Sequence, residues 1–433
     1  MLRTLKKIIP KPIFEFFQPA YHYSLALLGA LIYRFPSRKL IVIGVTGTKG
    51  KTTTTELVNA TLEAGGYKTA LQSTLRFKIG DEEKRNLFKM TMPGRFATQK
   101  FLREAIEAGC THAIIEMSSE GSKQFRHKFI YPDALIFTNL APEHIESHGS
   151  YENYVNAKIL IAKELENKKD KIMIANIDDK ESEKFLALNI ENKIPYSLDD
   201  TVSMKANEQG SSFQVGKLVI HSKLPGVFNI YNMLGAIAYA KFIGIPEEKI
   251  KKGLEEINFI RGRMEKINVY PNSEVEQEQN FDVVVDYAHT PDSLKAIYET
   301  YNSCKKICIL GNTGGGRDKW KREEMGKIAD KYCDQIILTN EDPYDEDPEK
   351  IVEDVKKGIK KKPIEIIMDR REAINKAIQN ALNIKQTSGD KYKVAVLITG
   401  KGTDPCICGP DGSRQEWDDA TVAREELQKV LKK

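Results

Sequence analysis

Residues 41–53 read IVIGVTGTKGKTT, an apolar run that enters a glycine-rich turn and is followed by a lysine and two threonines. The apolar run is typical of a buried strand, and the residues after the turn are typical of the start of a helix. Glycines in such a turn let backbone N–H groups close on an anion, while Lys51 adds a positive charge and Thr52 a hydroxyl for Mg2+. The stretch therefore predicts a strand, loop and helix that bind a nucleoside triphosphate. The residues expected to contact it are Gly47, Thr48, Lys49, Gly50, Lys51, Thr52 and Thr53.

Short apolar runs alternate with helical stretches along the rest of the chain, which is the pattern of strand–helix–strand units in parallel sheets. The fold class is therefore α/β. Strands are expected at residues 40–45, 113–116, 134–138 and 171–176, and again from about 283, at 306–310, 335–339, 364–368 and 394–399. We expect three parts: an apolar and basic helical segment at 1–39, a central P-loop-type ATP-binding domain at 40–259 and a C-terminal Rossmann-like domain at 260–433. The cleft between the two large domains is the expected site.

The amino-acid composition argues against some classes of function. The 433 residues include 66 basic and 61 acidic side chains, a net charge of +5 without the concentrated basic stripe that a duplex needs, so no nucleic-acid partner is expected. Six cysteines match neither a zinc ribbon nor a secreted disulfide framework. We expect packed or surface thiols in a reducing cytoplasm.

The first forty residues contain an unusual apolar stretch. Residues 16–33 carry no Asp, Glu, Lys or Arg, and basic residues flank them on both sides. A signal peptide is not expected because no small-residue cleavage site follows, and polar residues argue against a spanning helix. Two interpretations stay open: a helix that packs on the next domain, and an interfacial helix that contacts a membrane through residues 13–35.

Two further polar residues fall near the phosphate loop. Glu116 ends an expected strand and His144 lies in a loop, and this pairing of a carboxylate and an imidazole suits Mg2+ with phosphate. Residues 144–148, HIESH, match neither order of the common zinc-protease motifs, so a zinc protease is not expected.

The combination of motifs resembles the Mur ligases, which build peptidoglycan precursors. The GTKGKTT form of the loop, EMSSE at 116–120, FTNLAPEH at 137–144 and HGSYENYVNAK at 148–158 follow one another as in that family. The resemblance implies that ATP and two Mg2+ ions are used, and that Thr52, Glu116, His144 and a carbamylated Lys158 are metal ligands. It also implies that the catalytic residues are Lys51, Glu116, His144, Lys158, Arg263 and His289.

Motifs in the second half extend the resemblance. The segment GVFNIYN at 226–232 is similar to the family motif in which the second asparagine, Asn232, contacts adenine; the sequence alone supports only a helix N-cap at Asn229 or Asn232. The segment VVVDYAHTPD at 283–292 resembles the tripeptide synthetases of the family. There Asp286 is expected to bind ribose and His289 to approach the γ phosphate, while Arg263 reaches the phosphates.

Three departures concern the substrates. About forty N-terminal residues are too few for the UDP-binding domain of the tripeptide synthetases, so a lipid-linked or smaller acceptor stays open. Thr91, Met92 and Pro93 replace a Thr-Thr-Pro motif, and residues 341–344, EDPY, replace the Asp-Asn-Pro-Arg of diaminopimelate enzymes. The residues expected to bind substrate are Thr91, Met92, Pro93, Ser118, Asp342, Tyr344, Gly400 and Asp404.

The resemblance implies a monomeric cytoplasmic enzyme that adds an amino acid, with a diamino acid favoured, to a UDP-MurNAc-peptide-like carboxylate through an acyl phosphate. Two alternatives stay open. One is another amide ligase of the superfamily, of the folylpolyglutamate, cyanophycin or poly-γ-glutamate type, or one with a lipid-linked substrate. The other is a non-catalytic nucleotide-binding relative.

Overall fold

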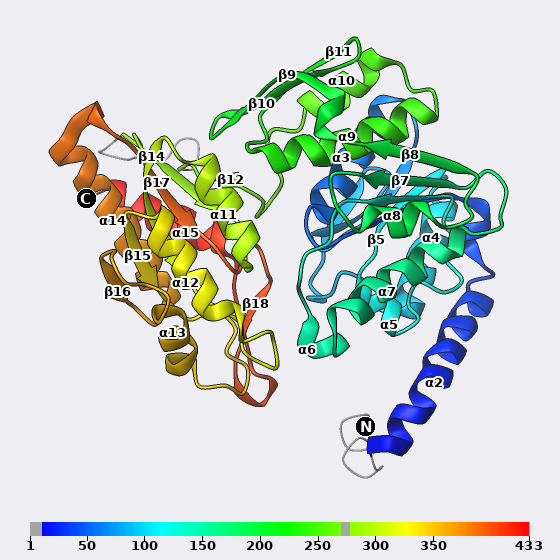
Figure 1. Ribbon diagram of the computed structural model, residues 1–433, viewed down its shortest axis with the longest axis horizontal. Coiled ribbons are helices and arrows are strands. Elements are labelled where there is room, and N and C mark those ends of the chain that lie inside the picture. The colour runs from blue at the N-terminus through cyan, green and yellow to red at the C-terminus, as the bar shows by residue number, and fades with distance from the viewer. Residues whose placement is uncertain (1–10, 270–277, 433) are drawn as a thin grey trace.

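A computed structural model describes residues 11–269 and 278–432 of the chain, arranged as two α/β lobes with a projecting N-terminal helix (Figure 1). The α/β class predicted from the sequence is confirmed. Every strand predicted above is present, with ends that differ by a few residues.

The central lobe is built on an eight-stranded sheet in the order β4-β3-β2-β5-β1-β6-β7-β8. The six strands from β2 to β8 in that order are parallel, and β3 and β4 extend the sheet as antiparallel strands. The strands are β1 (Ile41–Thr46), β2 (Thr69–Gln72), β3 (Arg76–Ile79), β4 (Glu82–Arg85), β5 (His112–Glu116), β6 (Ala134–Phe137), β7 (Ile172–Asn176) and β8 (Asn192–Tyr196). Because β1 lies between β5 and β6, the chain order reverses beside it, and ligands bind at such switch points, outside the carboxyl ends of the strands.

Helices cover both faces of this sheet and bury its apolar strands. One core contains side chains of the helices α3 (Lys51–Ala64), α9 (Val227–Phe242) and α10 (Glu247–Glu255). The other contains side chains of α4 (Arg95–Glu107), α7 (Tyr151–Ala162) and α8 (Ser182–Leu186). The short helices α5 (Ser119–Lys123) and α6 (Ile145–His148) lie near the carboxyl ends of the strands. An antiparallel sheet that the sequence analysis did not foresee adds β9 (Thr201–Asn207), β10 (Gly210–Val215) and β11 (Leu218–Ser222).

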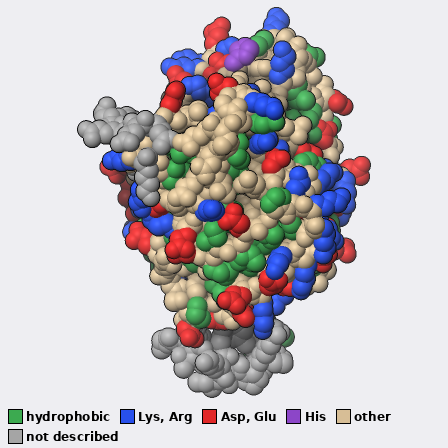
Figure 2. All heavy atoms as spheres, turned by 90° about the vertical axis from the view of Figure 1, so that its left-hand side faces the viewer, with side chains coloured by type: hydrophobic (Ala, Val, Ile, Leu, Met, Phe, Trp, Pro, Cys, Tyr) green, Lys and Arg blue, Asp and Glu red, His purple; other side chains and the backbone are tan. Residues whose placement is uncertain are grey.

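The C-terminal lobe holds a six-stranded sheet in the order β12-β13-β17-β14-β15-β16, in which only the edge strand β12 is antiparallel. Its strands are β12 (Glu265–Lys266), β13 (Asp282–Val285), β14 (Cys304–Leu310), β15 (Gln335–Leu338), β16 (Ile364–Ile366) and β17 (Lys393–Ile398). Its helices are α11 (Pro291–Thr300), α12 (Lys321–Tyr332), α13 (Pro348–Lys356), α14 (Arg370–Ser388) and α15 (Asp419–Leu431), and a hairpin of β18 (Cys406–Cys408) and β19 (Arg414–Glu416) completes it. Acidic and basic side chains are interspersed on the outer face of this lobe (Figure 2).

The boundary predicted at residues 259 and 260 remains a proposal. The chain leaves the central lobe after α10 and enters the C-terminal sheet at β12, so residues 256–264 connect the lobes.

Helix α2 (Lys11–Ile32) precedes the central lobe; residues 1–10 of the predicted segment lie outside the described residues. Its second half packs against α4 and buries Ala26 and Ala30. Among the residues that the structure describes, no helix is both long and apolar enough to cross a bilayer.

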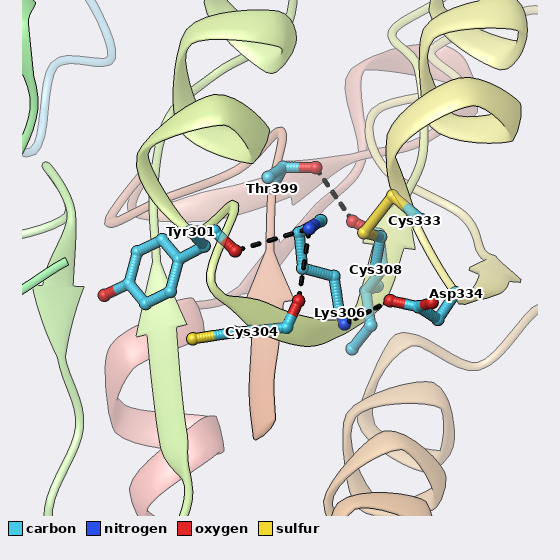
Figure 3. The surroundings of a disulfide bond; sticks show 8 residues. Tyr301, Cys304, Lys306, Cys308, Cys333, Asp334 and Thr399 are labelled. Atoms are coloured by element: carbon cyan, nitrogen blue, oxygen red, sulfur yellow. Dashed lines mark hydrogen bonds between the residues drawn. A yellow bond between two sulfur atoms is a disulfide. The ribbon is translucent and has the colours of Figure 1, made fainter. Parts of the chain in front are cut away.

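The expectation that all six cysteines are thiols is wrong for two of them. Cys308 on β14 and Cys333, just after α12, form a disulfide across 25 residues of sequence, with Cα atoms 6.1 Å apart (Figure 3). Sequence spacing does not predict this pair, because the fold brings together two residues that are 25 positions apart. Cys110, Cys304, Cys406 and Cys408 are free and buried.

Candidate active site

A cavity of about 910 Å³ is lined by residues of both lobes. All of the site residues predicted from the sequence line this cavity except Gly47 and Pro93. They are Thr48, Lys49, Gly50, Lys51, Thr52, Thr53, Thr91, Met92, Glu116, Ser118, His144, Lys158, Asn232, Arg263, Asp286, His289, Asp342, Tyr344, Gly400 and Asp404. The topology therefore gathers side chains that are up to about 350 residues apart in the sequence.

The phosphate loop connects β1 to α3 and requires glycine at two positions. Gly47 has a φ of 152°, and a Cβ there would lie 1.9 Å from Thr138 Oγ1; Gly50 has a φ of 80°, and its Cβ would lie 2.2 Å from Asn232 Oδ1. Thr48 and Lys49 donate their backbone N–H groups to Asn139, at 2.8 and 2.9 Å. The loop is thus held open at the start of a 14-residue helix, where an anion is favoured.

Lys51 begins α3, and its ammonium lies inside the loop. Its Nζ donates to the carbonyl of Thr48 at 3.0 Å, and burial lowers the pKa of this lysine. An anionic phosphate in the loop would offset that cost by pairing with the charge.

Thr52 and Glu116 meet at the carboxyl ends of neighbouring strands. The Thr52 hydroxyl donates to Glu116 Oε2 at 3.0 Å, and the backbone N–H of Thr74 donates to the same oxygen at 2.8 Å. In the described part of the chain, no group of three or more His, Cys, Asp or Glu side chains forms a ready metal cage. A hydroxyl and one carboxylate beside a phosphate loop nevertheless fit Mg2+, which usually binds one or two protein oxygens together with substrate phosphates.

Lys158 on α7 is buried against the phosphate loop. Its Nζ donates to the Gly47 carbonyl at 2.7 Å and lies 5.0 Å from the ring centroid of Tyr154. Burial, followed by the charge of Lys51, holds the pKa of Lys158 well below its ordinary value. His144 flanks the same tyrosine, with ring centroids 6.0 Å apart, and burial lowers its pKa to about 3. Burial therefore disfavours the charged form of both side chains.

A polar cluster joins the two lobes. His289 Nε2 of the C-terminal lobe lies 2.7 Å from Glu143 Oε1 of the central lobe, and Lys49 Nζ lies 3.4 Å from the same nitrogen. Burial raises the pKa of Glu143, but Lys49 and His289 outweigh it and hold that pKa well below its ordinary value. Burial lowers the pKa of His289 to about 4. Glu143 lies within the FTNLAPEH motif, but the sequence does not indicate its role, because its partner His289 is 146 residues away.

Two more residues predicted to contact the nucleotide are Asp286 and Arg263. Asp286 accepts the backbone N–H groups of Met264 at 2.8 Å and Ala288 at 2.7 Å, and burial raises its pKa. The Arg263 guanidinium lies 4.7 Å from the centroid of the Tyr287 ring.

The N-cap interpretation of Asn229 and Asn232 is wrong. Helix α9 begins at Val227 with Gly226 as its cap, so both asparagines lie inside the helix. Asn232 accepts the Thr54 hydroxyl at 3.2 Å and donates to Asn229 at 3.1 Å. The Asn232 side chain therefore does not cap the helix, and it lies next to the phosphate loop.

The predicted substrate residues form two groups. In the central lobe, Thr91 pairs its hydroxyl with that of Thr74 at 2.9 Å, Met92 is buried, and Ser118 caps α5 by accepting the Gly121 N–H at 3.1 Å. In the C-terminal lobe, the group is Asp342, Tyr344, Gly400 and Asp404. Side chains that sequence reasoning missed also line the cavity: Lys89, Arg126, Glu143, Tyr154 and Arg317. Lys89, two residues before the Thr91 motif, offered a signal.

A phosphate loop in one lobe that faces acidic and basic side chains of a second lobe defines a nucleotide-dependent α/β enzyme with a second substrate. The family descriptions "Mur ligase middle domain" and "Mur ligase, glutamate ligase domain" match residues 45–240 and 262–402. The chain belongs to the Mur ligase family. It is an ATP-dependent enzyme that forms carbon–nitrogen bonds, and the family in general depends on Mg2+.

Similar proteins agree with this assignment. UDP-N-acetylmuramoyl-L-alanyl-D-glutamate--2,6-diaminopimelate ligase of Syntrophomonas wolfei is 35% identical over 432 residues, which cover 96% of this chain and 83% of the relative. The enzyme of the same name from Aquifex aeolicus is 36% identical, covering 92% of this chain and 80% of the relative. A solved ligase of this name is 27% identical, with a TM-score of 0.58 over 90% of this chain and 78% of that one. Mycobacterium tuberculosis folylpolyglutamate synthase, 17% identical, shares the fold with a TM-score of 0.67 over 88% of this chain and 92% of that one.

Proposed function

We propose that this chain joins a diamino acid to the terminal carboxylate of a UDP-MurNAc-dipeptide-like precursor in peptidoglycan synthesis. The observation that carries the proposal is the shared cavity: the phosphate loop of one lobe and the acidic Asp342 and Asp404 of the other line one space of about 910 Å³. Relatives named as diaminopimelate ligases, which the chain matches over most of their length, support the same substrate class.

The proposed reaction has two steps. A substrate carboxylate oxygen attacks the γ-phosphorus of ATP, the bond to the β-phosphate oxygen breaks, and ADP leaves. The amine of the amino acid then attacks the acyl carbon, inorganic phosphate leaves, and the amine loses a proton to solvent or a nearby base. Phosphoryl transfer of this kind depends on positioning and charge neutralisation more than on covalent catalysis.

The side chains divide these tasks. Lys51 in the loop and Arg263 from the C-terminal lobe supply positive charge to the phosphates. His289 remains neutral above a pH of about 4 and acts as a hydrogen-bonding group near the γ-phosphate. Asn232 contacts the adenine, and Asp286 the ribose. Closure of the lobes through Glu143 and His289 excludes water that would hydrolyse the acyl phosphate.

The metal sites are proposed from the donor set. Thr52 and Glu116 would hold one Mg2+, and Glu116, His144 and a carbamylated Lys158 a second; the ions neutralise phosphate charge when bound. Carbamylation needs an unprotonated amine, and burial shifts the pKa of Lys158 in the direction that favours one. The carbamate would turn a basic nitrogen into an anionic oxygen ligand.

The proposal is tested by measuring phosphate release with ATP, Mg2+ and a panel of amino acids. UDP-MurNAc-L-Ala-D-Glu, the free muramyl dipeptide and a lipid-linked form serve as alternative acceptors, because the acceptor class is open. Release that requires both a diamino acid and one of these acceptors is expected. Release that never depends on an amine would refute the ligase proposal.

We further propose that helix α2 contacts the lipid surface of the cytoplasmic membrane. The enzyme would work as a monomer on the cytoplasmic side, where ATP is present. Figure 1 shows the first half of α2 standing away from the central lobe, and Phe16 and Phe17 are 77% and 61% exposed there. Exposed Arg34 and Lys39 follow the helix and suit anionic headgroups.

The lipid proposal is tested with vesicles that contain anionic phospholipid. Wild type is expected to sediment with the vesicles and the double substitution Phe16→Glu/Phe17→Glu to stay in solution. If wild type does not sediment, the proposal fails. If the double substitution abolishes a concentration-dependent dimer in ultracentrifugation, a second copy of the chain covers the helix instead.

A further inference from the structure

Two carboxylates at the rim of the C-terminal sheet face two ammonium groups. Asp342 follows β15, and Asp404 follows β17. Lys401 of the same lobe is fully buried and donates to both oxygens of Asp342, at 2.9 and 3.0 Å, and to the Cys406 carbonyl at 2.7 Å. Its Nζ is also 3.4 Å from Asp404. Lys401 is therefore a fixed part of this pocket.

The second ammonium comes from the other lobe. Lys89 lies between β4 and α4, and its Nζ donates to Asp342 Oδ2 at 2.7 Å, to the Cys406 carbonyl at 3.2 Å and to Cys408 Sγ at 3.1 Å. Asp404 Oδ2 is 3.6 Å away. Five atoms or groups of the C-terminal lobe thus surround this one ammonium when the Tyr344 ring, 5.7 Å away, is included.

The backbone of Lys89 is not relaxed. Its φ is 53°, in the left-handed region that side chains with a Cβ seldom adopt. Such a conformation is unfavourable and persists only where contacts hold it. The contacts that can hold Lys89 in this conformation are those of its ammonium with the acidic pocket.

The charges in the pocket determine what kind of group could replace the Lys89 ammonium. Among the groups in direct ion-pair contact, two carboxylates face two ammonium groups with Lys89 in place; without it, Asp342 and Asp404 contact Lys401 alone, which leaves two carboxylates with one ammonium. The pocket is largely buried, so an unpaired carboxylate there is unfavourable, and a second cation is favoured. Burial lowers the pKa of Lys89, but the charges of Asp404 and Asp342 outweigh burial and hold that pKa above its ordinary value.

From this geometry we infer that Lys89 holds the place of the side-chain ammonium of the amino-acid substrate and must leave the Asp342–Asp404 pocket before a diamino acid can bind. The inference rests on the proposed function and deepens it, because it assigns the distal amine to a definite pocket and names an internal competitor. Thr91, two residues along the same loop, lines the cavity where the carboxylate substrate is expected. Lys89 and Thr91 therefore line one cavity, and the exchange of Lys89 for the substrate ammonium would take place inside it.

The test is isothermal titration of L-lysine, diaminopimelate and L-norleucine into wild type and Lys89→Met, with ADP and Mg2+ present. Lys84→Met is the matched control, since Lys84 is exposed on β4, five residues before Lys89. We expect about tenfold tighter binding of both diamino acids to Lys89→Met, with no change for norleucine or for the control. ADP affinity checks that each protein is folded, and Lys89→Gln is the second neutral variant.

Several outcomes would overturn the inference: unchanged or weaker diamino-acid binding to the neutral variants, or no binding to any of the proteins. Lys89→Arg keeps the charge and should bind within about twofold of wild type; if it also gained tenfold, competition by the ammonium would be wrong. Steady-state kinetics should show the same gain as a lower KM for the diamino acid with an unchanged KM for ATP. Failure of the proposed function is distinguished because it removes phosphate release, whereas calorimetry needs no turnover.

Discussion

Arg370 and Asp419 form a buried ion pair behind the amino-acid pocket, and its removal should destabilise the C-terminal lobe. Arg370 Nε and Nη2 donate to the two oxygens of Asp419 at 2.8 and 2.7 Å, and both side chains are at most 1% exposed. Trp417 Nε1 donates to Asp419 at 2.8 Å, and Arg370 also donates to the Thr399 carbonyl at 2.9 Å. The substitution is Asp419→Ala.

The expected magnitude follows from what this substitution leaves behind. Removing one partner of a buried pair costs about 3–5 kcal/mol, because the remaining charge is buried without compensation. The Trp417 N–H also loses its acceptor, which costs about 1 kcal/mol more. With a urea m-value of about 2 kcal/mol/M, the midpoint should fall by about 2–3 M. The neighbouring pair of Arg371 and Glu425 is 40% and 42% exposed, so Glu425→Ala should cost less than about 1 kcal/mol.

Urea unfolding followed by tryptophan fluorescence measures this difference, since the two tryptophans, Trp320 and Trp417, both lie in the C-terminal lobe. Asp419→Asn, which keeps the volume and removes the charge, separates the charge effect from a cavity. Equal midpoints for Asp419→Ala and Glu425→Ala would refute the argument that burial makes the first pair matter.

Three further predictions concern the site. Lys51→Ala should lower the rate of phosphate release by on the order of 100-fold or more, because a preorganised charge at the phosphates is lost, with little change in the thermal midpoint. Lys158→Ala should lower it to a similar degree and regain activity with added acetate or propionate if a carbamate is the ligand; wild-type activity without rescue would contradict the carbamate. His148, whose Nε2 lies 3.3 Å from Glu120 Oε1, lowers the pKa of that carboxyl from 4.5 to about 2, so the stabilisation from this contact is present above pH 4.5 and lost as the pH falls towards 2. Glu120→Gln should therefore flatten the loss of stability between those pH values, as measured by acid unfolding.

Local patterns predicted most of the fold. The phosphate loop at 41–53 was read correctly because a strand, a glycine turn and a helix start are specified by neighbouring residues, whose conformations depend on local sterics and hydrogen bonds. The strands of both parallel sheets were found because strands buried on both faces are continuous apolar runs. Strands β9, β10 and β11 were missed, since alternating, partly exposed strands carry a weaker signal.

The site was predicted less completely, and the errors share one cause. The disulfide of Cys308 and Cys333, and the approach of Glu143 to His289, depend on which strands and lobes become neighbours. The position of Lys89 beside the Thr91 motif pointed to the cavity but not to its ion pair with Asp342, because 253 residues separate the two side chains. No rule based on the spacing of residues in the sequence relates side chains that are this far apart.

The sequence by itself determined the α/β class, the phosphate loop and the identity of the residues around it, because these features arise from contacts between residues close in the chain. The tertiary structure alone decided which charges meet across the cleft: His289 with Glu143, and Lys89 with Asp342. The physical reason is that a buried charge needs a partner, and only the packing of the two lobes determines which distant side chain supplies it.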